Sequence, residues 1–234
     1  MMILAVDTSS VVVSVAVMDN EQLLYEAYCH HDRNHSEVLM SLIEDALLKS
    51  EVHQKDLDLI AVSGGPGSFT GLRIGISTVK GLAQAIEKPV VSVPTLDALA
   101  WNIIGMDGLV CPIMDARRGQ VYTCLYNRKG AEFNKLMPYS ALPVTQLAEH
   151  LSGYKQPIIF VGDGLRVHRK RIKELMGDAA FFAPGYLACQ RASAIAWLGR
   201  QEALAGNVLH YQELKPFYLR QSQAEQKRKQ QTGI

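Results

Sequence analysis

The chain has 234 residues, enough for one large domain or two small ones. Apolar residues make up 48% of it and charged residues 20%, which predicts a packed core and argues against a disordered chain. A formal net charge of +1 excludes a global basic field for nucleic acid but leaves room for a local patch. The four cysteines lack C-x-x-C spacing and so indicate neither a zinc nor a redox motif. Without a basic leader or a membrane-length apolar run, we expect a cytoplasmic protein with no membrane contact.

The first half of the chain is predicted to form three strands and then alternating helices and strands. Turn residues in "DTSS" and "DNEQ" separate the first three strands, which indicates an antiparallel start. Asn34, with Glu37 three residues later, resembles a capping box that opens the first helix. This mixed order is typical of an α/β layer fold. The predicted elements are strands at Met2–Val6, Val11–Met18 and Leu23–Tyr28, a helix from Asn34, a strand at Leu59–Val62, a helix at Thr70–Glu87 and a strand at Val90–Val93.

The second half again opens with three predicted strands, which suggests a duplicated architecture. We expect one lobe at 1–105, a second at 106–220, and a flexible polar tail at 221–234. The predicted elements are strands at Leu109–Met114, Val121–Tyr126 and Phe133–Tyr139, a helix at Pro143–Leu151, a strand at Ile158–Val161, a helix at Val167–Met176, a strand at Ala179–Ala183 and a helix at Arg191–Ala205.

The stretch "SGGPGSFTGLRIG", residues 63–75, has the composition of a phosphate-binding loop. It fails both phosphate motifs in detail, because no lysine follows its glycines and Thr70 stands where a dinucleotide fingerprint needs glycine. Ser68 is a candidate N-cap for the helix that follows. That helix has an apolar arc of roughly 220°, about twice what one sheet covers.

Two interpretations of this wide arc stay open. In the first, the helix is buried between its own sheet and a neighbouring helix of the same domain. In the second, it covers its sheet and offers a second face to another chain, together with surplus apolar groups of the first helix, Met40 and Leu47.

Turns at the ends of predicted strands supply the candidate ligand-binding residues. A carboxylate and hydroxyls follow the first strand, and an aspartate follows the first strand of the second half, so the two turns indicate a nucleotide cleft between the lobes. A third loop, "GDG", is expected to lie against a base or ribose. Simple tight turns are the competing interpretation, and for the turn after the first strand an Asx-type turn is the favoured one. The candidates are Asp7, Thr8, Ser9, Asp115, Gly162 and Gly164. His31 and His35 lie four residues apart but lack a third ligand nearby, so we expect no metal site there.

The motifs "ILAVDTSS", "NHSEVLM", "GPGSFTGLRIG", "KPVVSVPTLDALA", "MDARRGQVY" and "PFYLR" together resemble the bacterial TsaB (YeaZ) family, over nearly the whole chain to about Arg220. The resemblance implies a two-lobed actin-like ATPase (ribonuclease H-like) α/β fold with a mixed sheet and helices in each lobe. It also implies a non-catalytic scaffold role in making threonylcarbamoyladenosine beside the tRNA anticodon. The implied partners are the catalytic relative TsaD and the ATPase TsaE, with a homodimer when the chain is alone and tRNA contacted only through the complex.

The resemblance further implies what this chain lacks. The H-x-x-x-H metal pair of the catalytic relative falls on Thr95 and Leu99, so no catalytic residue and no metal are expected. Ser9 replaces a phosphate-loop glycine, so we expect no tightly bound cofactor, and ATP or ADP only at the interface of an assembled complex. The expected partner-interface residues are Leu39, Met40, Ile43, Phe69, Gly71, Leu72, Gly75, Ile76 and Val79.

Two other functions remain open at this point. One is an enzyme, either a metallopeptidase or a small-molecule kinase of the actin-like class. The other is direct tRNA binding through basic residues near the C-terminus, Arg220, Lys227, Arg228 and Lys229.

Overall fold

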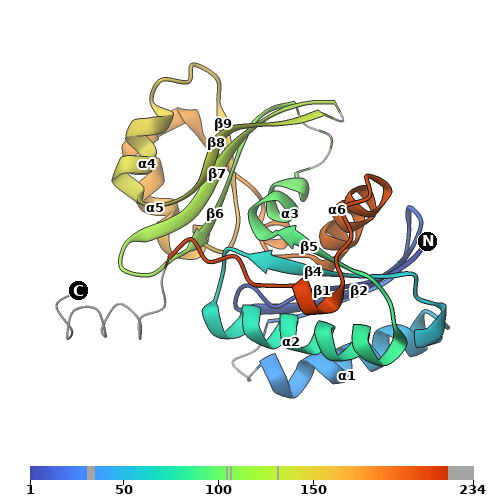
Figure 1. Ribbon diagram of the computed structural model, residues 1–234. Coiled ribbons are helices and arrows are strands. Elements are labelled where there is room, and N and C mark those ends of the chain that lie inside the picture. The colour runs from blue at the N-terminus through green and yellow to red at the C-terminus, as the bar shows by residue number, and fades with distance from the viewer. Residues whose placement is uncertain (31–34, 104, 106, 131, 221–234) are drawn as a thin grey trace, which may run out of the picture.

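The computed structural model describes residues 1–30, 35–103, 105, 107–130 and 132–220, which form two lobes (Figure 1). Each lobe is built on a five-stranded mixed sheet. The strand order is β3-β2-β1-β4-β5 in the first lobe and β8-β7-β6-β9-β10 in the second. In both sheets the first three strands of the lobe pair antiparallel and the last two are parallel. The strands are β1 (Met2–Asp7), β2 (Val12–Asp19), β3 (Gln22–His30), β4 (Leu59–Gly65), β5 (Val90–Pro94), β6 (Gly108–Asp115), β7 (Gln120–Lys129), β8 (Glu132–Pro143), β9 (Ile158–Val161) and β10 (Ala180–Phe182).

The helices cover both faces of the sheets. The side chains of α1 and α2 share one core with one face of the first sheet, while α6 packs on its other face. The second sheet is covered by α4 and α5. The short α3 lies between the sheets, with Ala98 in the core of the first lobe and Leu96 and Leu99 in that of the second. The helices are α1 (His35–Lys49), α2 (Phe69–Ile86), α3 (Thr95–Trp101), α4 (Val144–Leu151), α5 (Leu165–Met176) and α6 (Ala192–Leu204).

The predicted α/β class and the duplicated strand order are confirmed. The helix α3 was not predicted, because seven residues that follow a strand directly are too few to display a helical period. The predicted cap at Asn34 and the predicted tail at 221–234 lie outside the described residues. Within the described part of the chain, no helix is both long and apolar enough to span a bilayer.

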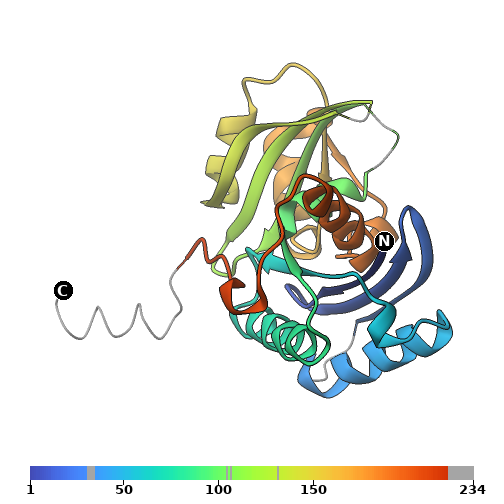
Figure 2. The ribbon, with the colours of Figure 1, turned by 45° about the vertical axis from the view of Figure 1, so that its right-hand side comes forward.

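The chain returns to the first lobe after completing the second sheet (Figure 2). Ile195 on α6 is fully buried against the first sheet, and Leu209 pairs with Val90 of the edge strand β5. Leu214 lies in the core that α1 and α2 share, and the Phe217 amide donates to the Gly64 carbonyl at 2.7 Å. The predicted lobe boundaries are therefore wrong for the last part of 106–220, which belongs to the first lobe by packing.

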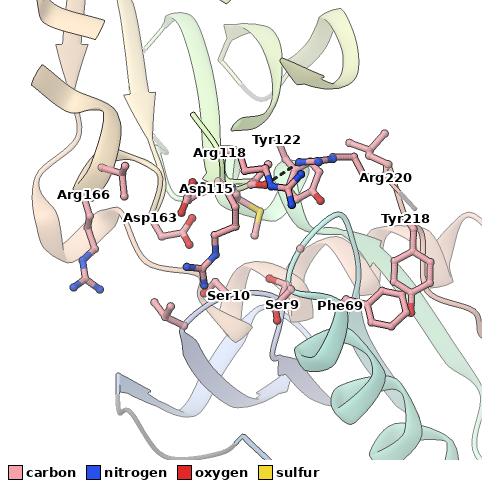
Figure 3. Close-up of a pocket in the computed structure, with 18 of the residues that line it drawn as sticks. Ser9, Ser10, Phe69, Asp115, Arg118, Tyr122, Asp163, Arg166, Tyr218 and Arg220 are labelled. Carbon is pink, nitrogen blue, oxygen red and sulfur yellow. Dashed lines mark hydrogen bonds between the residues drawn. The ribbon is translucent and has the colours of Figure 1, made fainter. Parts of the chain in front are cut away.

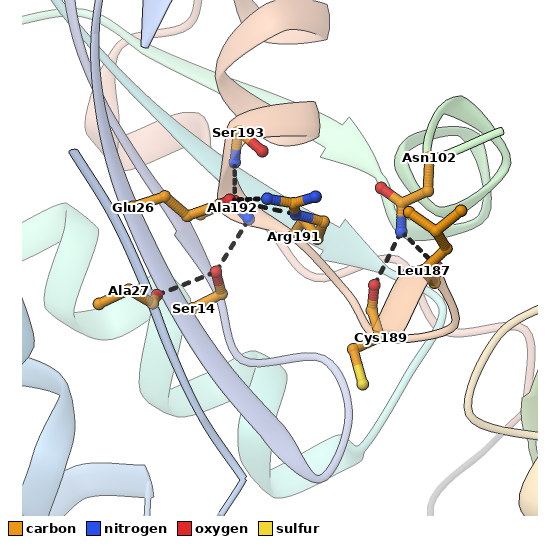
Figure 4. A network of polar contacts seen from close by, with 9 residues as sticks. All are labelled: Ser14, Glu26, Ala27, Asn102, Leu187, Cys189, Arg191, Ala192 and Ser193. Atoms are coloured by element: carbon orange, nitrogen blue, oxygen red, sulfur yellow. Dashed lines mark hydrogen bonds and ion pairs between the residues drawn. The ribbon is translucent and has the colours of Figure 1, made fainter. Parts of the chain in front are cut away.

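A polar network fixes the start of α6 on strands β2 and β3 (Figure 4). No side chain of its own caps this helix. The Ala192 amide instead donates to the Ser14 hydroxyl at 3.0 Å, and the Ser193 amide donates to the Glu26 carboxylate at 2.9 Å. Arg191 forms an ion pair with the same carboxylate, whose side chain is only 6% exposed. The first lobe thus supplies the oxygen atoms that satisfy free amides of the last helix.

Replacing Glu26 with alanine is expected to lower the free energy of unfolding by about 2–3 kcal/mol, because a buried amide and a guanidinium lose a charged acceptor. Urea denaturation measures this change. Glu21→Ala is the matched control, since Glu21 is exposed and its one ion pair among the described residues is with Arg200 at 3.6 Å. It should cost less than about 1 kcal/mol. Equal effects of the two variants would contradict this account of how α6 is held.

Candidate functional site: the cleft between the lobes

The glycine stretch 63–75 packs against the turn between β1 and β2, which is the first turn of the chain. A Cβ atom on Gly67 would lie 2.4 Å from the Ser9 carbonyl oxygen. One on Gly71 would lie 2.0 Å from the Thr8 carbonyl oxygen, and one on Gly75 would lie 2.3 Å from the Thr8 hydroxyl. Three glycines spaced four residues apart therefore let the start of α2 approach the β1–β2 turn more closely than any residue with a side chain would allow.

Hydrogen bonds close this contact. The Thr8 hydroxyl donates to the Gly71 carbonyl at 2.8 Å, and the Ser68 amide donates to the Ser9 carbonyl at 2.7 Å. The Ser68 hydroxyl accepts from the Gly71 amide at 3.2 Å, which confirms the predicted N-cap. The backbone of the turn thus occupies the space that a glycine-rich loop would otherwise offer to a ligand.

Most of the predicted partner-interface side chains are buried in their own lobe. Leu39, Ile43, Leu72, Ile76 and Val79 are each at most 4% exposed, and all of them except Leu72 belong to one core cluster. They pack on the first sheet and between α1 and α2, so their prediction as surface contacts is wrong.

The remaining members of that predicted set divide into two pairs. Gly71 and Gly75 are explained by the contact with Thr8 and not by a partner chain. Met40 is 41% exposed and Phe69 is half-buried, so both stay predicted contacts. The wide apolar arc of α2 follows from burial between a sheet and a neighbouring helix, which is the first of the two interpretations.

A cleft of about 720 Å³ opens where the two lobes meet (Figure 3). Serine hydroxyls of the first turn lie on one side, and the β6–β7 turn and the start of α5 lie on the other. The C-terminal segment closes one end. The residues labelled in the figure are Ser9, Ser10, Phe69, Asp115, Arg118, Tyr122, Asp163, Arg166, Tyr218 and Arg220.

Asp7 lies behind this cleft and is fully buried. Its Oδ1 accepts hydrogen bonds from the Ser9 amide at 2.8 Å and the Ser9 hydroxyl at 2.6 Å. Its Oδ2 has no hydrogen-bond partner among the described residues. Burial raises the pKa of this carboxyl above its usual value, and the bonds from Ser9 oppose that rise. Asp7 and the buried Thr8 support the turn and do not line the cleft.

A chain of polar contacts crosses the cleft floor from one lobe to the other. The Ser10 hydroxyl donates to the Gln190 side chain at 2.7 Å, and the amide of Gln190 reaches Asp163 at 3.5 Å. Burial raises the pKa of Asp163 to about 6, and the nearby charge of Asp115 adds to the rise. His168 lies 3.4 Å from the Asp115 carboxylate. Gln190 and His168 were not predicted, because contacts 180 and 53 residues apart leave no local pattern.

Two predicted ligand contacts prove to be packing contacts. A Cβ atom on Gly162 would lie 2.1 Å from the Ile113 carbonyl oxygen, and one on Gly164 would lie 3.0 Å from it. These glycines press against β6, so their prediction as base or ribose contacts is wrong. Asp163 between them does line the cleft, as do the predicted Ser9 and Asp115.

The C-terminal segment ties the two lobes together across one end of the cleft. The Tyr218 ring stacks on Phe69 with 4.7 Å between centroids, and its hydroxyl accepts from Arg73 at 3.1 Å. The Arg220 guanidinium donates to the Ala116 carbonyl at 3.0 Å, in the β6–β7 turn. Arg220 is therefore part of the cleft wall and not of a free tail.

The family model described as "TsaD: tRNA N6-adenosine threonylcarbamoyltransferase" matches residues 30–228. The chain is 34% identical over 227 residues to the tRNA threonylcarbamoyladenosine biosynthesis protein TsaB of Bacillus subtilis, covering 97% of each chain. The chain belongs to the TsaB family. YeaZ from Pseudomonas aeruginosa has a similar structure, with a TM-score of 0.80 at 28% identity over 93% of this chain and 99% of that one.

The TsaB family takes part in tRNA threonylcarbamoyladenosine biosynthesis, so the predicted family and process are both confirmed. The fold is that of the actin-like ATPases. A ROK hexokinase from Thermus thermophilus shares it with a TM-score of 0.52 at 12% identity, over 87% of this chain and all of that one. At such low identity the likeness establishes only the fold.

In this TsaB-family chain, the positions expected for a metal-binding histidine pair lie in the core. Thr95 and Leu99 on α3 are at most 1% exposed. His35 does not belong to that pair of positions and lies near the first turn. Its Nε2 is 2.7 Å from the Ser10 carbonyl oxygen, and this contact holds the turn. The predicted His31 lies outside the described residues.

Asp163 makes the stability of the protein fall as pH rises. Its pKa of about 6 in the folded state lies above the ordinary 3.8, so the native state binds the extra proton between these values. The stabilisation that this group contributes in its protonated form is complete below about pH 4. As the pH rises past 6, that contribution to the free energy of unfolding, roughly 3 kcal/mol, is lost. Asp163→Asn should remove that part of the slope in urea denaturation from pH 4.5 to 7.5. Asp178→Asn, at an exposed position, should leave the slope as it is. A wild-type slope in Asp163→Asn would refute the assignment.

Proposed function

We propose that the chain is a non-catalytic scaffold and activator subunit, required for threonylcarbamoyl transfer to the adenosine beside the tRNA anticodon. Family membership supports the process, and the first turn supports the absence of catalysis. The carboxylate of Asp7 is fully buried, does not line the cleft and accepts hydrogen bonds from Ser9. Thr95 and Leu99 are packed in the core where a metallopeptidase-like site needs two histidines.

The proposed role requires partners. We propose that the chain pairs with TsaD, works with TsaE, forms a homodimer when alone, and contacts tRNA within the complex. The outer face of α1 supports a pairing surface, because Met40 is 41% exposed and Leu48, eight residues later on the same broad helical face, is 74% exposed. Phe69 adds a half-buried ring at the start of α2.

The first turn of the free chain lacks the features by which a phosphate loop holds a nucleotide. Ser9 carries a side chain where close phosphate approach needs glycine, and its hydroxyl is engaged by Asp7. We therefore propose that no cofactor binds tightly to the free chain, and that ATP or ADP binds only at the interface of the assembled complex.

The pairing surface is tested by size-exclusion chromatography with light scattering, for the chain alone and mixed with the TsaD protein of the same organism. We expect a homodimer alone and a heterodimer in the mixture. Met40→Asp with Leu48→Asp should weaken both by tenfold or more, since each puts a charge into an apolar contact. Leu204→Asp is the control, because Leu204 is 60% exposed on α6.

Two outcomes of this experiment would count against the proposal. A chain that stays monomeric and ignores TsaD would return the function to an enzyme, and stoichiometric tightly bound zinc or iron would strengthen that alternative. Intact assemblies in the doubly charged variant would place the pairing surface elsewhere.

A further inference from the structure

Helix α5 concentrates positive charge on a chain that is nearly neutral as a whole. Its 12 residues hold five cations and one acidic residue, against a net charge of +1 for 234 residues. Leu165, His168 and Ile172 face the core. Four of the cations recur at the i, i+3, i+4, i+7 spacing that places side chains on one helical face, and all four are exposed. This basic stripe consists of Arg166, Arg169, Lys170 and Lys173.

The stripe is weakly neutralised by the rest of the molecule. Lys170 forms no ion pair among the described residues, and Lys173 pairs only with the fully exposed Asp178 at 3.0 Å. Such exposed pairs contribute little and exchange readily with other anions. Arg169 lies over the Phe182 ring at 4.8 Å, which orients its guanidinium without cancelling its charge. The fifth cation, Arg171, lies off the stripe and pairs with Glu174.

The stripe continues into the cleft mouth. Arg166 lines the cleft together with Arg117, Arg118 and Arg220 (Figure 3). Arg117 and Arg118 are exposed, and neither forms an ion pair within the described part of the chain. Both have left-handed backbone conformations, with φ of 67° and 54°, which non-glycine residues seldom adopt. A band of guanidinium and ammonium groups thus runs from the β6–β7 turn along α5, a helix path of about 10 Å from Arg166 to Lys173.

We propose that this band binds the phosphate backbone of RNA, with tRNA as the RNA if the proposed function holds. Clustered Lys and Arg side chains on one helical face are the electrostatic footprint of a nucleic-acid surface, and guanidinium groups match phosphate geometry. An anionic membrane is the less suitable partner. A membrane-bound helix needs a continuous exposed apolar face. The side of α5 that carries Leu165 and Ile172 is buried in its own lobe, and the exposed Val167 and Leu175 stand eight residues apart at opposite ends of the helix.

The test measures binding of an unmodified tRNA transcript that reads a codon beginning with A, at 50 and 200 mM salt, with equimolar TsaD protein present. The stripe variant carries Arg169→Gln, Lys170→Gln and Lys173→Gln. The control variant removes the same charge from exposed positions elsewhere, through Lys49→Gln, Lys55→Gln and Lys129→Gln. The stripe variant should raise Kd tenfold or more at 50 mM salt. Its slope of log K against log salt should fall by about 2, because three phosphate contacts are lost.

Several results would overturn the inference. These are no RNA binding by the wild type, an unchanged Kd and slope in the stripe variant, and equal losses in both variants. A stripe-dependent affinity for phosphatidylserine vesicles with unchanged RNA affinity would identify a membrane, and not RNA, as the partner of the stripe. Lost TsaD pairing with unchanged RNA affinity would identify a protein as that partner.

Two controls keep the result interpretable. Lys170→Gln alone, at an exposed side chain without an ion pair among the described residues, should lower the slope by about 0.7–0.9 even if the triple variant folds poorly. Light scattering on the same samples reads pairing separately. Stripe-dependent RNA binding without pairing would leave this inference standing and remove the scaffold proposal.

Discussion

The close contact between the start of α2 and the β1–β2 turn is the constraint on which the rest of the structure depends. Gly67, Gly71 and Gly75 permit the approach, and the Thr8 hydroxyl fastens it. Once α2 is seated there, its apolar residues face the first sheet and α1, and Asp7 is buried behind Ser9. The N-terminal end of α2 then carries Ser68 and Phe69 to the cleft rim. A stretch with the composition of a phosphate cradle therefore serves the architecture of the protein itself.

The second constraint is the path of the chain between the lobes. The chain crosses through α3, builds the second sheet, and returns through α6 to the first lobe. It finally stacks Tyr218 on Phe69 and bonds Arg220 to the opposite turn. The cleft is therefore enclosed by segments from both ends of the chain. This arrangement joins the two lobes with internal contacts.

Local patterns made much of the fold predictable. Short apolar runs predicted strands within a few residues of β1, β2 and β4, because burial of both faces selects apolar residues over short lengths. The packing partner of each helix was not predictable. The apolar residues of α6 indicate a buried face but not that the sheet it packs on ends at Pro94, 98 residues before the helix begins. The boundary at 106–220 was wrong for that reason.

The candidate site was predictable only where a turn marks it. Ser9 and Asp115 follow strand ends and do line the cleft. Gly162 and Gly164 stand in an equally suggestive turn, yet they pack against Ile113. Glycine marks close approach without telling whether a ligand or the chain's own backbone approaches. Apolar helix residues are ambiguous in a similar way. Leu72 and Val79 were predicted as partner contacts, yet they belong to the core.

The proposed scaffold role means that this TsaB-family chain supports threonylcarbamoyl transfer without performing it. Reconstituted transfer to an unmodified tRNA transcript tests it most directly, with TsaD, TsaE and threonylcarbamoyl-adenylate present and this chain included or omitted. The account predicts modification only when the chain is present with TsaD, and unchanged modification when Asp7 is replaced by asparagine. Transfer by this chain in the absence of TsaD, or abolished by Asp7→Asn in a folded protein, would contradict it.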